Sequence, residues 1–208
     1  MSPAFPRSIA DGLPARTPEP PALSRLRELL LEQGGLVASL VRMVDASSEG
    51  DGAASDRDAR GGVDSARPAA LAAAGPRADG HRDEYELLVE AIYEGYLLHY
   101  GRPRVVLARE ADVGVLAGDR LYAIGLERLV ALGDADAVAE LADTIMLSAL
   151  AQGSGEAELA EEIWHAGARA VGWGPTAEHA RAKALVLEGS DEALEAMRTS
   201  AQTHLRAR

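Results

Sequence analysis

The tripeptide Gly101-Arg102-Pro103, together with Leu116-Ala117-Gly118-Asp119 further along, decides how the chain divides into helices. Glycine and proline both disfavour a helix interior, so the tripeptide ends the helical pattern that runs from Asp83 to Tyr100. The second stretch lies inside the next pattern, from about Leu107 to Leu132, which Gly133 ends as a residue suited to the left-handed conformation. The two stretches therefore predict two long helices joined by a short break.

The helix predicted from Leu107 to Leu132 carries apolar residues on nearly every side, which is typical of the centre of a helical bundle. Further helical patterns cover Ala22–Asp45, Arg67–Ala74, Asp134–Ala151, Glu156–Val171, Thr176–Leu187 and Asp191–Leu205. Gly34-Gly35 is placed to kink or split the first of them. Because no strand pattern competes, the sequence predicts an all-α fold.

The sequence also predicts how the chain is organised around these helices. Met1 to Pro21 contains repeated prolines, which block helices and sheet ladders, so we expect a disordered leader. Residues 22–208 are predicted to form a single helical domain. Within it, residues 46–62 are rich in Ser, Gly and Asp and predict a mobile loop.

Composition excludes several classes of function. The net charge of −12 argues against nucleic-acid binding, because neutralising phosphates requires a basic surface. The absence of cysteine excludes disulfides and zinc–thiolate sites. No apolar run approaches the roughly 20 residues that cross a bilayer, and the N-terminus has no secretory h-region. We therefore expect a cytoplasmic protein without a membrane span.

Four pieces of the chain, in this order, carry a resemblance to a known family. They are Gly61-Gly62 with Arg67-Pro68-Ala69, Leu87 to Glu94, Gly101 to Asp119, and Ala142 to Gly153. From Gly61 to roughly Glu158 the chain resembles the trans-polyprenyl diphosphate synthases. The resemblance implies an isoprenoid-synthase-like helical bundle, here degenerate and truncated.

The resemblance also implies roles for individual residues. Glu90 and Glu94 stand where the family has the first and last aspartates of its first magnesium-binding motif, and Ala91 replaces a middle one. Arg67 and Arg102 are the residues left to hold a diphosphate. Gly101, Pro103, Gly118 and Asp119 are implied as structural residues.

The departures from the family pattern weaken the implied chemistry. Ionising an allylic diphosphate needs metal ions and cationic side chains to stabilise the leaving group. No second acidic metal motif follows Glu158, so we expect no confident catalytic residue, and Mg²⁺ only if the chain is an enzyme. A solvated helix face is the ordinary explanation for Glu90 and Glu94. Asp119 is expected to be buried and to pair with Arg109 or Arg120, or to cap a helix.

Three functions are therefore expected from the sequence. The first is a non-catalytic isoprenoid-synthase-like protein, acting as a partner subunit or as a scaffold that binds a protein or lipid. It would form a homo-oligomer or bind a hetero-partner or an apolar ligand, through the helices predicted at Leu107–Leu132 and Asp134–Ala151. The second is a prenyltransferase with an altered metal motif. The third is a helical-hairpin module for protein interaction.

Overall fold

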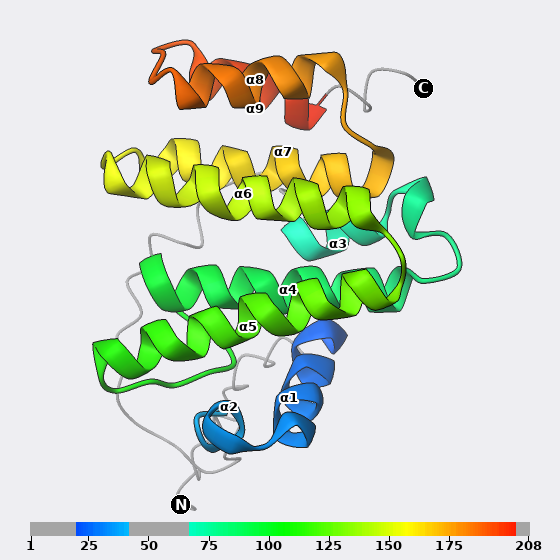
Figure 1. Cartoon of the computed structure of the whole chain (residues 1–208), viewed down its shortest axis with the longest axis vertical. Helices are drawn as coiled ribbons and strands as arrows, with labels where there is room; N and C mark the ends of the chain where they lie inside the picture. The colour runs from blue at the N-terminus through cyan, green and yellow to red at the C-terminus, as the bar shows by residue number, and fades with distance from the viewer. Residues whose placement is uncertain (1–19, 42–66, 203–208) are drawn as a thin grey trace, which may run out of the picture.

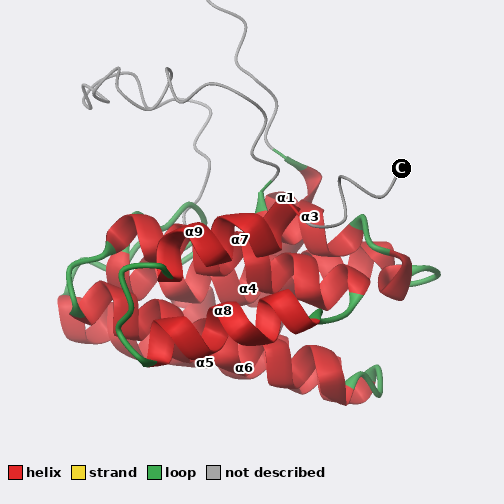
Figure 2. Ribbon diagram, turned by 90° about the horizontal axis from the view of Figure 1, so that it is seen from above, coloured by secondary structure: helices red, strands yellow, loops and turns green. Residues whose placement is uncertain are grey.

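The computed structural model describes residues 20–41 and 67–202, and every regular element within these ranges is a helix (Figure 2). The elements are α1 (Pro21–Gln33), α2 (Gly35–Ser39), α3 (Pro68–Ala73), the 3-10 turn η2 (Pro76–Ala78), α4 (Arg82–Tyr100), α5 (Ala111–Ala131), α6 (Ala135–Gly153), α7 (Ala157–Trp173), α8 (Ala177–Leu187) and α9 (Ala193–Gln202). The predicted all-α class is confirmed. The loop predicted at 46–62 and nearly all of the predicted leader lie outside the described residues.

Consecutive helices pair side by side, and the pairs are stacked in layers (Figure 1). α4 packs on α5, α6 on α7, and α8 on α9. The short helix α3 lies between two layers and contacts both α4 and α7. α1 covers the other side of the α4–α5 pair, with α2 next to it. The described part of the chain is therefore a stack of helical hairpins.

Helix α5 does not lie at the centre of this stack, as its apolar sequence predicts. One side of it is buried against α4 and α1, and includes Ala117, Leu121 and Ile124. On the other side Leu116 and Val130 are exposed by 60% and 64%. The prediction that α5 lies at the centre of the bundle is wrong. The helix that follows it, α6, packs mainly on α7 and therefore covers little of the outer side of α5.

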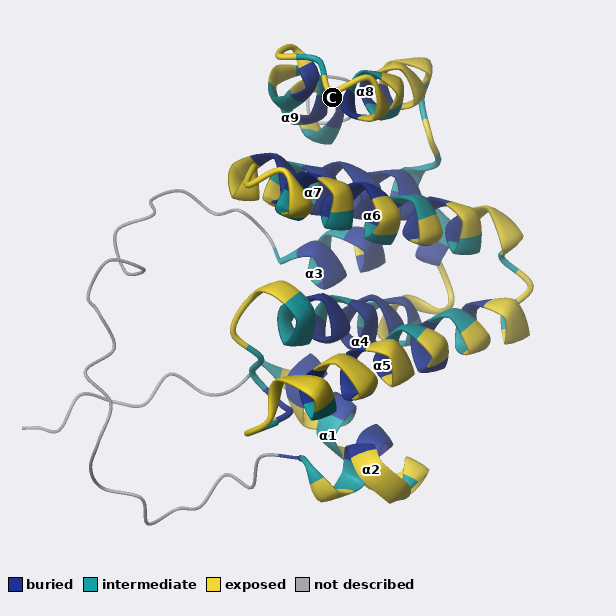
Figure 3. Ribbon diagram, turned by 60° about the vertical axis from the view of Figure 1, so that its left-hand side comes forward, coloured by how far each residue is buried: buried dark blue, intermediate teal, exposed yellow. Residues whose placement is uncertain are grey.

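Within residues 20–41 and 67–202 the apolar core forms three clusters that follow the layers. The first joins α1 and α2 to α4 and α5, the second joins α3 to α4 and α7, and the third joins α6 and α7 to α8 and α9. Figure 3 shows the same pattern, with buried residues facing the neighbouring helices and exposed residues on the outside. Trp164 of α7 is buried against Tyr93 and Tyr96 of α4, so the second cluster ties two hairpins together.

Local sequence signals set the helix boundaries at several turns. Asp134 caps α6, because its side chain accepts a hydrogen bond from the backbone N–H of Ala137 at 3.0 Å. Thr176 caps α8 in the same way through the N–H of His179 at 3.1 Å. Gly34 and Gly35 have φ of 68° and 62°, and they separate α1 from α2 as the glycine pair predicts.

Glycines allow neighbouring helices to approach closely, as the contacts of α7 with α3 and of α4 with α5 show. A Cβ at Gly172 of α7 would lie 2.5 Å from the carbonyl oxygen of Ala72 in α3. Between α4 and α5, a Cβ at Gly95 would lie 2.9 Å from the carbonyl oxygen of Gly118, and one at Gly125 would lie 2.3 Å from Cγ1 of Ile92. The α4 and α5 backbones are therefore in direct contact at these glycines, where a ligand has no room between them.

Candidate functional site

Glu90 and Glu94 are the predicted metal ligands, and both are buried on α4. Their exposed fractions are 1% and 0%, so the ordinary expectation of a solvated helix face is wrong. The two side chains share one face of the helix because they are four residues apart. That face points toward the loop of residues 101–110 and toward the start of α3.

The carboxylate of Glu94 holds the α4–α5 loop through its backbone. Its Oε1 accepts hydrogen bonds from three successive N–H groups, those of Arg104 at 2.7 Å, Val105 at 2.6 Å and Val106 at 3.1 Å. Its Oε2 accepts a fourth bond, from Nε of Arg104 at 3.2 Å. A buried carboxylate with this many donors is well compensated, so Glu94 acts as a structural anchor.

Glu90 is compensated by arginines. Arg104 Nη2 forms an ion pair with its Oε1, and Arg67 Nη1 lies 4.0 Å from its Oε2. The Arg104 guanidinium also lies over the ring of Tyr93, 5.2 Å from the ring centroid. Burial raises the pKa of Glu90, while the charges of Arg104 and Arg67 oppose that rise. Two carboxylates and two guanidinium groups therefore form a near-neutral cluster.

This cluster does not fit a magnesium site. Mg²⁺ needs several oxygen ligands in near-octahedral geometry, whereas the oxygens of Glu94 already accept four hydrogen bonds. Across residues 20–41 and 67–202, no three His, Asp or Glu side chains converge in a way that would hold a metal ion. Arg104 takes the position beside the two glutamates that a cation would need.

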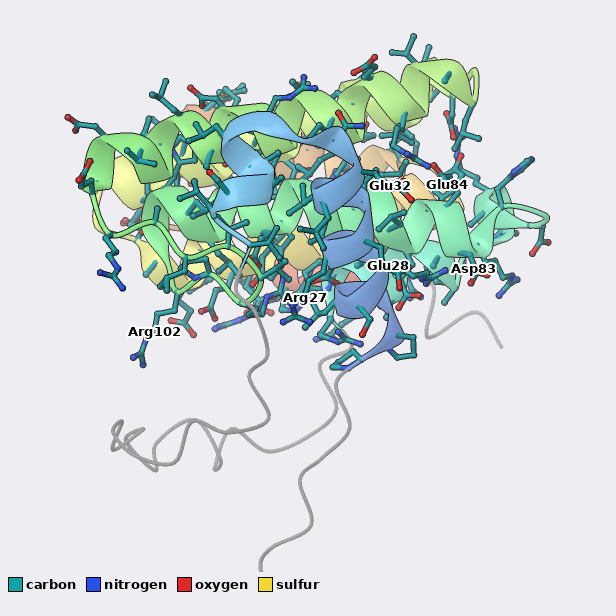
Figure 4. All side chains as sticks on the ribbon, turned by 90° about the horizontal axis from the view of Figure 1, so that it is seen from below. Arg27, Glu28, Glu32, Asp83, Glu84 and Arg102 are labelled. Carbon is teal, nitrogen blue, oxygen red and sulfur yellow. The ribbon has the colours of Figure 1, made fainter. Side chains whose placement is uncertain are left out.

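The other sequence-predicted residues do not join this cluster. Arg102 is exposed and points away from the helices (Figure 4). Gly101 follows the last residue of α4, Pro103 lies in the loop, and Gly118 contacts α4. Asp119 is exposed and pairs with Nε2 of His99 at 3.3 Å.

The expectation that Asp119 is buried and pairs with Arg109 or Arg120 is therefore wrong. The contacts of α5 with α4 and α2 leave the Asp119 side chain 62% exposed, at the edge of α4 where His99 lies. Arg120 donates instead to the side chain of Gln33, at 3.0 Å.

A second buried polar cluster connects α6, α8 and α9, and no sequence motif indicates it. His179 lies between Oγ of Ser200, 2.9 Å from its Nδ1, and Oε2 of Glu140, 3.1 Å from its Nε2. Lys183 donates to both oxygens of Glu140 at 3.0 Å and to Asp143 at 2.8 Å. The residues come from three helices, so only the folded chain brings them together.

The row Ser200–His179–Glu140 has the residue types of a hydrolytic triad, but its surroundings do not suit catalysis. Ser200 and His179 are 5% and 3% exposed. The cavity beside them has a volume of about 10 Å³, which accommodates a single small atom or water rather than a substrate. The cluster instead links the terminal hairpin to α6 through buried hydrogen bonds.

The second cluster predicts a pH dependence of stability. Burial by itself would raise the pKa of Glu140, but hydrogen bonds from His179 and Lys183 outweigh it and hold the pKa below its usual value. The stabilisation is therefore complete above the unfolded pKa, about 4.3, and is lost as pH falls through the lower folded pKa. Urea unfolding of Glu140→Gln is expected to show a flatter loss of stability below pH 4.3 than the unmodified chain. If the free energy of unfolding fell equally with pH in both proteins, the lowered pKa of Glu140 would not be the source of the acid sensitivity.

An open groove lies between α8 and α9. Its volume is about 540 Å³. Ala182, Leu185 and Ala196 supply apolar lining, and the acidic residues around it are Glu178, Asp191, Glu192 and Glu195. Arg181 is the one basic residue in this lining. The groove is therefore acidic with an apolar component.

Comparison of the chain with models of protein families, with curated proteins and with solved structures finds no match. Among the described helices, none is long and apolar enough to cross a membrane.

Proposed function

We propose that the chain is a non-catalytic helical scaffold that binds a partner protein in the groove between α8 and α9. The occupant we infer is a basic amphipathic segment of the partner. The observation that carries the proposal is the groove itself, an acidic concave surface with apolar residues within it, on the hairpin at one end of the stack (Figure 1).

The first support is that the residues expected to perform prenyl transfer have structural partners. Glu94 anchors the loop after α4, and Glu90 pairs with Arg104 and Arg67. The glycine contacts between α4 and α5 leave no substrate space at Gly95 and Gly125. These contacts disfavour the prenyltransferase alternative and favour a role as an interaction module.

The second support is the match between the groove and a basic helix or strand. Its volume, about 540 Å³, lies within the range of binding pockets, so it can take several side chains. Four carboxylates around apolar lining complement a segment that carries Lys or Arg beside Leu or Ile. The excess of acidic residues in the whole chain extends the same attraction over a longer distance.

A defined peptide tests the proposal. A fluorescently labelled amphipathic peptide of Lys and Leu is titrated with the full chain and followed by anisotropy, at low and at high salt. The double variant Glu192→Lys/Glu195→Lys is expected to weaken binding at least about tenfold, because it replaces attraction by repulsion in the groove. Added salt is expected to weaken binding by the unmodified chain.

The matched control is Glu127→Lys/Glu161→Lys, which makes the same change in net charge at exposed sites on α5 and α7. This control is expected to bind the peptide nearly as well as the unmodified chain. Equal weakening in both double variants would assign the binding to net charge and overturn the groove as the site. Absence of peptide binding together with flotation on zwitterionic vesicles would favour a lipid-binding scaffold instead.

A further inference from the structure

Residues 203–208, which follow α9 and lie outside the described residues, form a basic segment with an apolar residue inside it. Their sequence is Thr203-His204-Leu205-Arg206-Ala207-Arg208. Two of the six side chains are arginines, and none is acidic. The segment therefore has the chemistry inferred for an occupant of the α8–α9 groove, a cation beside a leucine.

The other segments outside the described residues have no such excess of positive charge. The side chains of residues 1–19 include two arginines and two acidic residues. Those of residues 42–66 include three arginines and six acidic residues. An acidic surface attracts a segment with net positive charge, so the chain itself offers residues 203–208 to the groove rather than the other two segments.

The carboxylates of the groove have no cationic partner among the described residues. They are the exposed side chains of Glu178, Asp191, Glu192 and Glu195. Within residues 20–41 and 67–202 none of the four forms an ion pair, whereas Arg198 pairs with Glu158 and Glu162 where α9 meets α7. The groove therefore presents unpaired negative charge to an incoming cation.

The basic segment begins at one end of the groove. In the α8–α9 hairpin, Nδ1 of His179 near the start of α8 lies 2.9 Å from Oγ of Ser200 near the end of α9. The start of α8 and the end of α9 are therefore side by side. Glu178 and Thr199 line the groove at this end, and Thr199 lies about 4.5 Å along the helix axis from Gln202, the last residue of α9.

The length of the segment matches the length of the groove. From Gln202 back to Glu192 the axis of α9 measures about 15 Å, at a rise of 1.5 Å per residue. A chain reversal over two residues leaves four, which span about 13 Å in extended form. Because arginine side chains reach further than the backbone, both arginines of the segment come within reach of Glu195 and Glu192.

We propose that residues 203–208 bind in the α8–α9 groove of their own chain and that the partner's basic segment displaces them. The two arginines pair with Glu192 and Glu195, and Leu205 contacts the apolar lining. Because the segment is tethered, its effective concentration at the groove is in the millimolar range, so even a contact with a Kd of about 1 mM is well populated. The displacement rests on the proposed function, whereas the contact within the chain does not.

NMR spectroscopy of the full chain tests the contact within the chain. The double variant Arg206→Glu/Arg208→Glu is expected to shift the backbone amide signals of Leu185 and Glu192, because it replaces attraction to the groove by repulsion. These two residues line the groove at the end far from the start of the segment, so a purely local effect of the substitutions does not reach them. Unchanged signals at Leu185 and Glu192 would overturn the proposal.

The matched control is Arg7→Glu/Arg16→Glu, which makes the same change in net charge within residues 1–19. This control is expected to leave the signals of Leu185 and Glu192 in place. Equal shifts in both double variants would assign the effect to net charge and overturn the contact.

The labelled Lys and Leu peptide measures the displacement. It is expected to bind Arg206→Glu/Arg208→Glu about three- to fivefold more tightly than the unmodified chain, because the tethered competitor is lost. A gain of the same size in the Arg7→Glu/Arg16→Glu control would overturn the displacement. If the amide signals shift as expected but the peptide binds neither protein, the contact within the chain stands and the proposed function fails.

Discussion

Replacing Glu94 by alanine is expected to lower the free energy of unfolding by about 3–5 kcal/mol, the usual loss on breaking a buried charged pair. The change removes the acceptor for three backbone N–H groups, those of Arg104, Val105 and Val106. It also leaves Arg104 with Glu90 as its remaining acidic partner. Urea unfolding followed by circular dichroism measures the loss.

Glu90→Gln is the control for this prediction. Because burial raises the pKa of Glu90, a neutral amide of the same shape replaces it at a smaller loss. Glu90 also accepts none of the loop amides, so the loop keeps its anchor. Equal losses for Glu94→Ala and Glu90→Gln would show that the loop amides contribute little.

The second large effect is expected at the contact between α3 and α7. Gly172→Ala is expected to lower the free energy of unfolding by about 2–3 kcal/mol, because overpacking of a rigid core costs this amount. The added Cβ would lie 2.5 Å from the carbonyl oxygen of Ala72, and two helix backbones cannot separate without disturbing the surrounding core.

Gly153→Ala provides the comparison, because a Cβ at Gly153 meets nothing within 4 Å. Alanine at this last residue of α6 is expected to leave stability unchanged or to raise it by up to about 1 kcal/mol through helix propensity. Chemical unfolding of both variants separates steric crowding from propensity. A Gly172→Ala protein as stable as Gly153→Ala would contradict the close contact.

The sequence predicts the helices well because their signals are local. Gly133 and Asp134 mark the end of α5 and the start of α6, and the Gly34-Gly35 pair marks the split between α1 and α2. The start of α5 depends on a contact with a distant segment rather than on a local signal. Leu107 donates to the carbonyl of Leu40 at 2.8 Å, so the loop continues to Glu110 and the helix begins at Ala111.

The candidate site is harder to predict because its partners come from distant segments without a pattern. The sequence brings Glu90 and Glu94 to one helix face, but it does not reveal that backbone N–H groups of a loop neutralise Glu94. The burial of Arg169 and the row of Glu140, His179 and Ser200 likewise depend on how the hairpins stack. The resemblance to polyprenyl diphosphate synthases stays a prediction.

The position of α3 affects how the whole stack comes apart. Hairpins that touch only their neighbours can be lost one layer at a time. α3 has six residues, too few to form a helix by itself, and depends on α4 and α7 together. Because α3 needs both neighbours, we expect the α4–α5 and α6–α7 layers to unfold together. The α8–α9 hairpin lies beyond α3, so its opening breaks a different set of contacts: the third core cluster and the hydrogen bonds of His179 and Lys183 to Glu140.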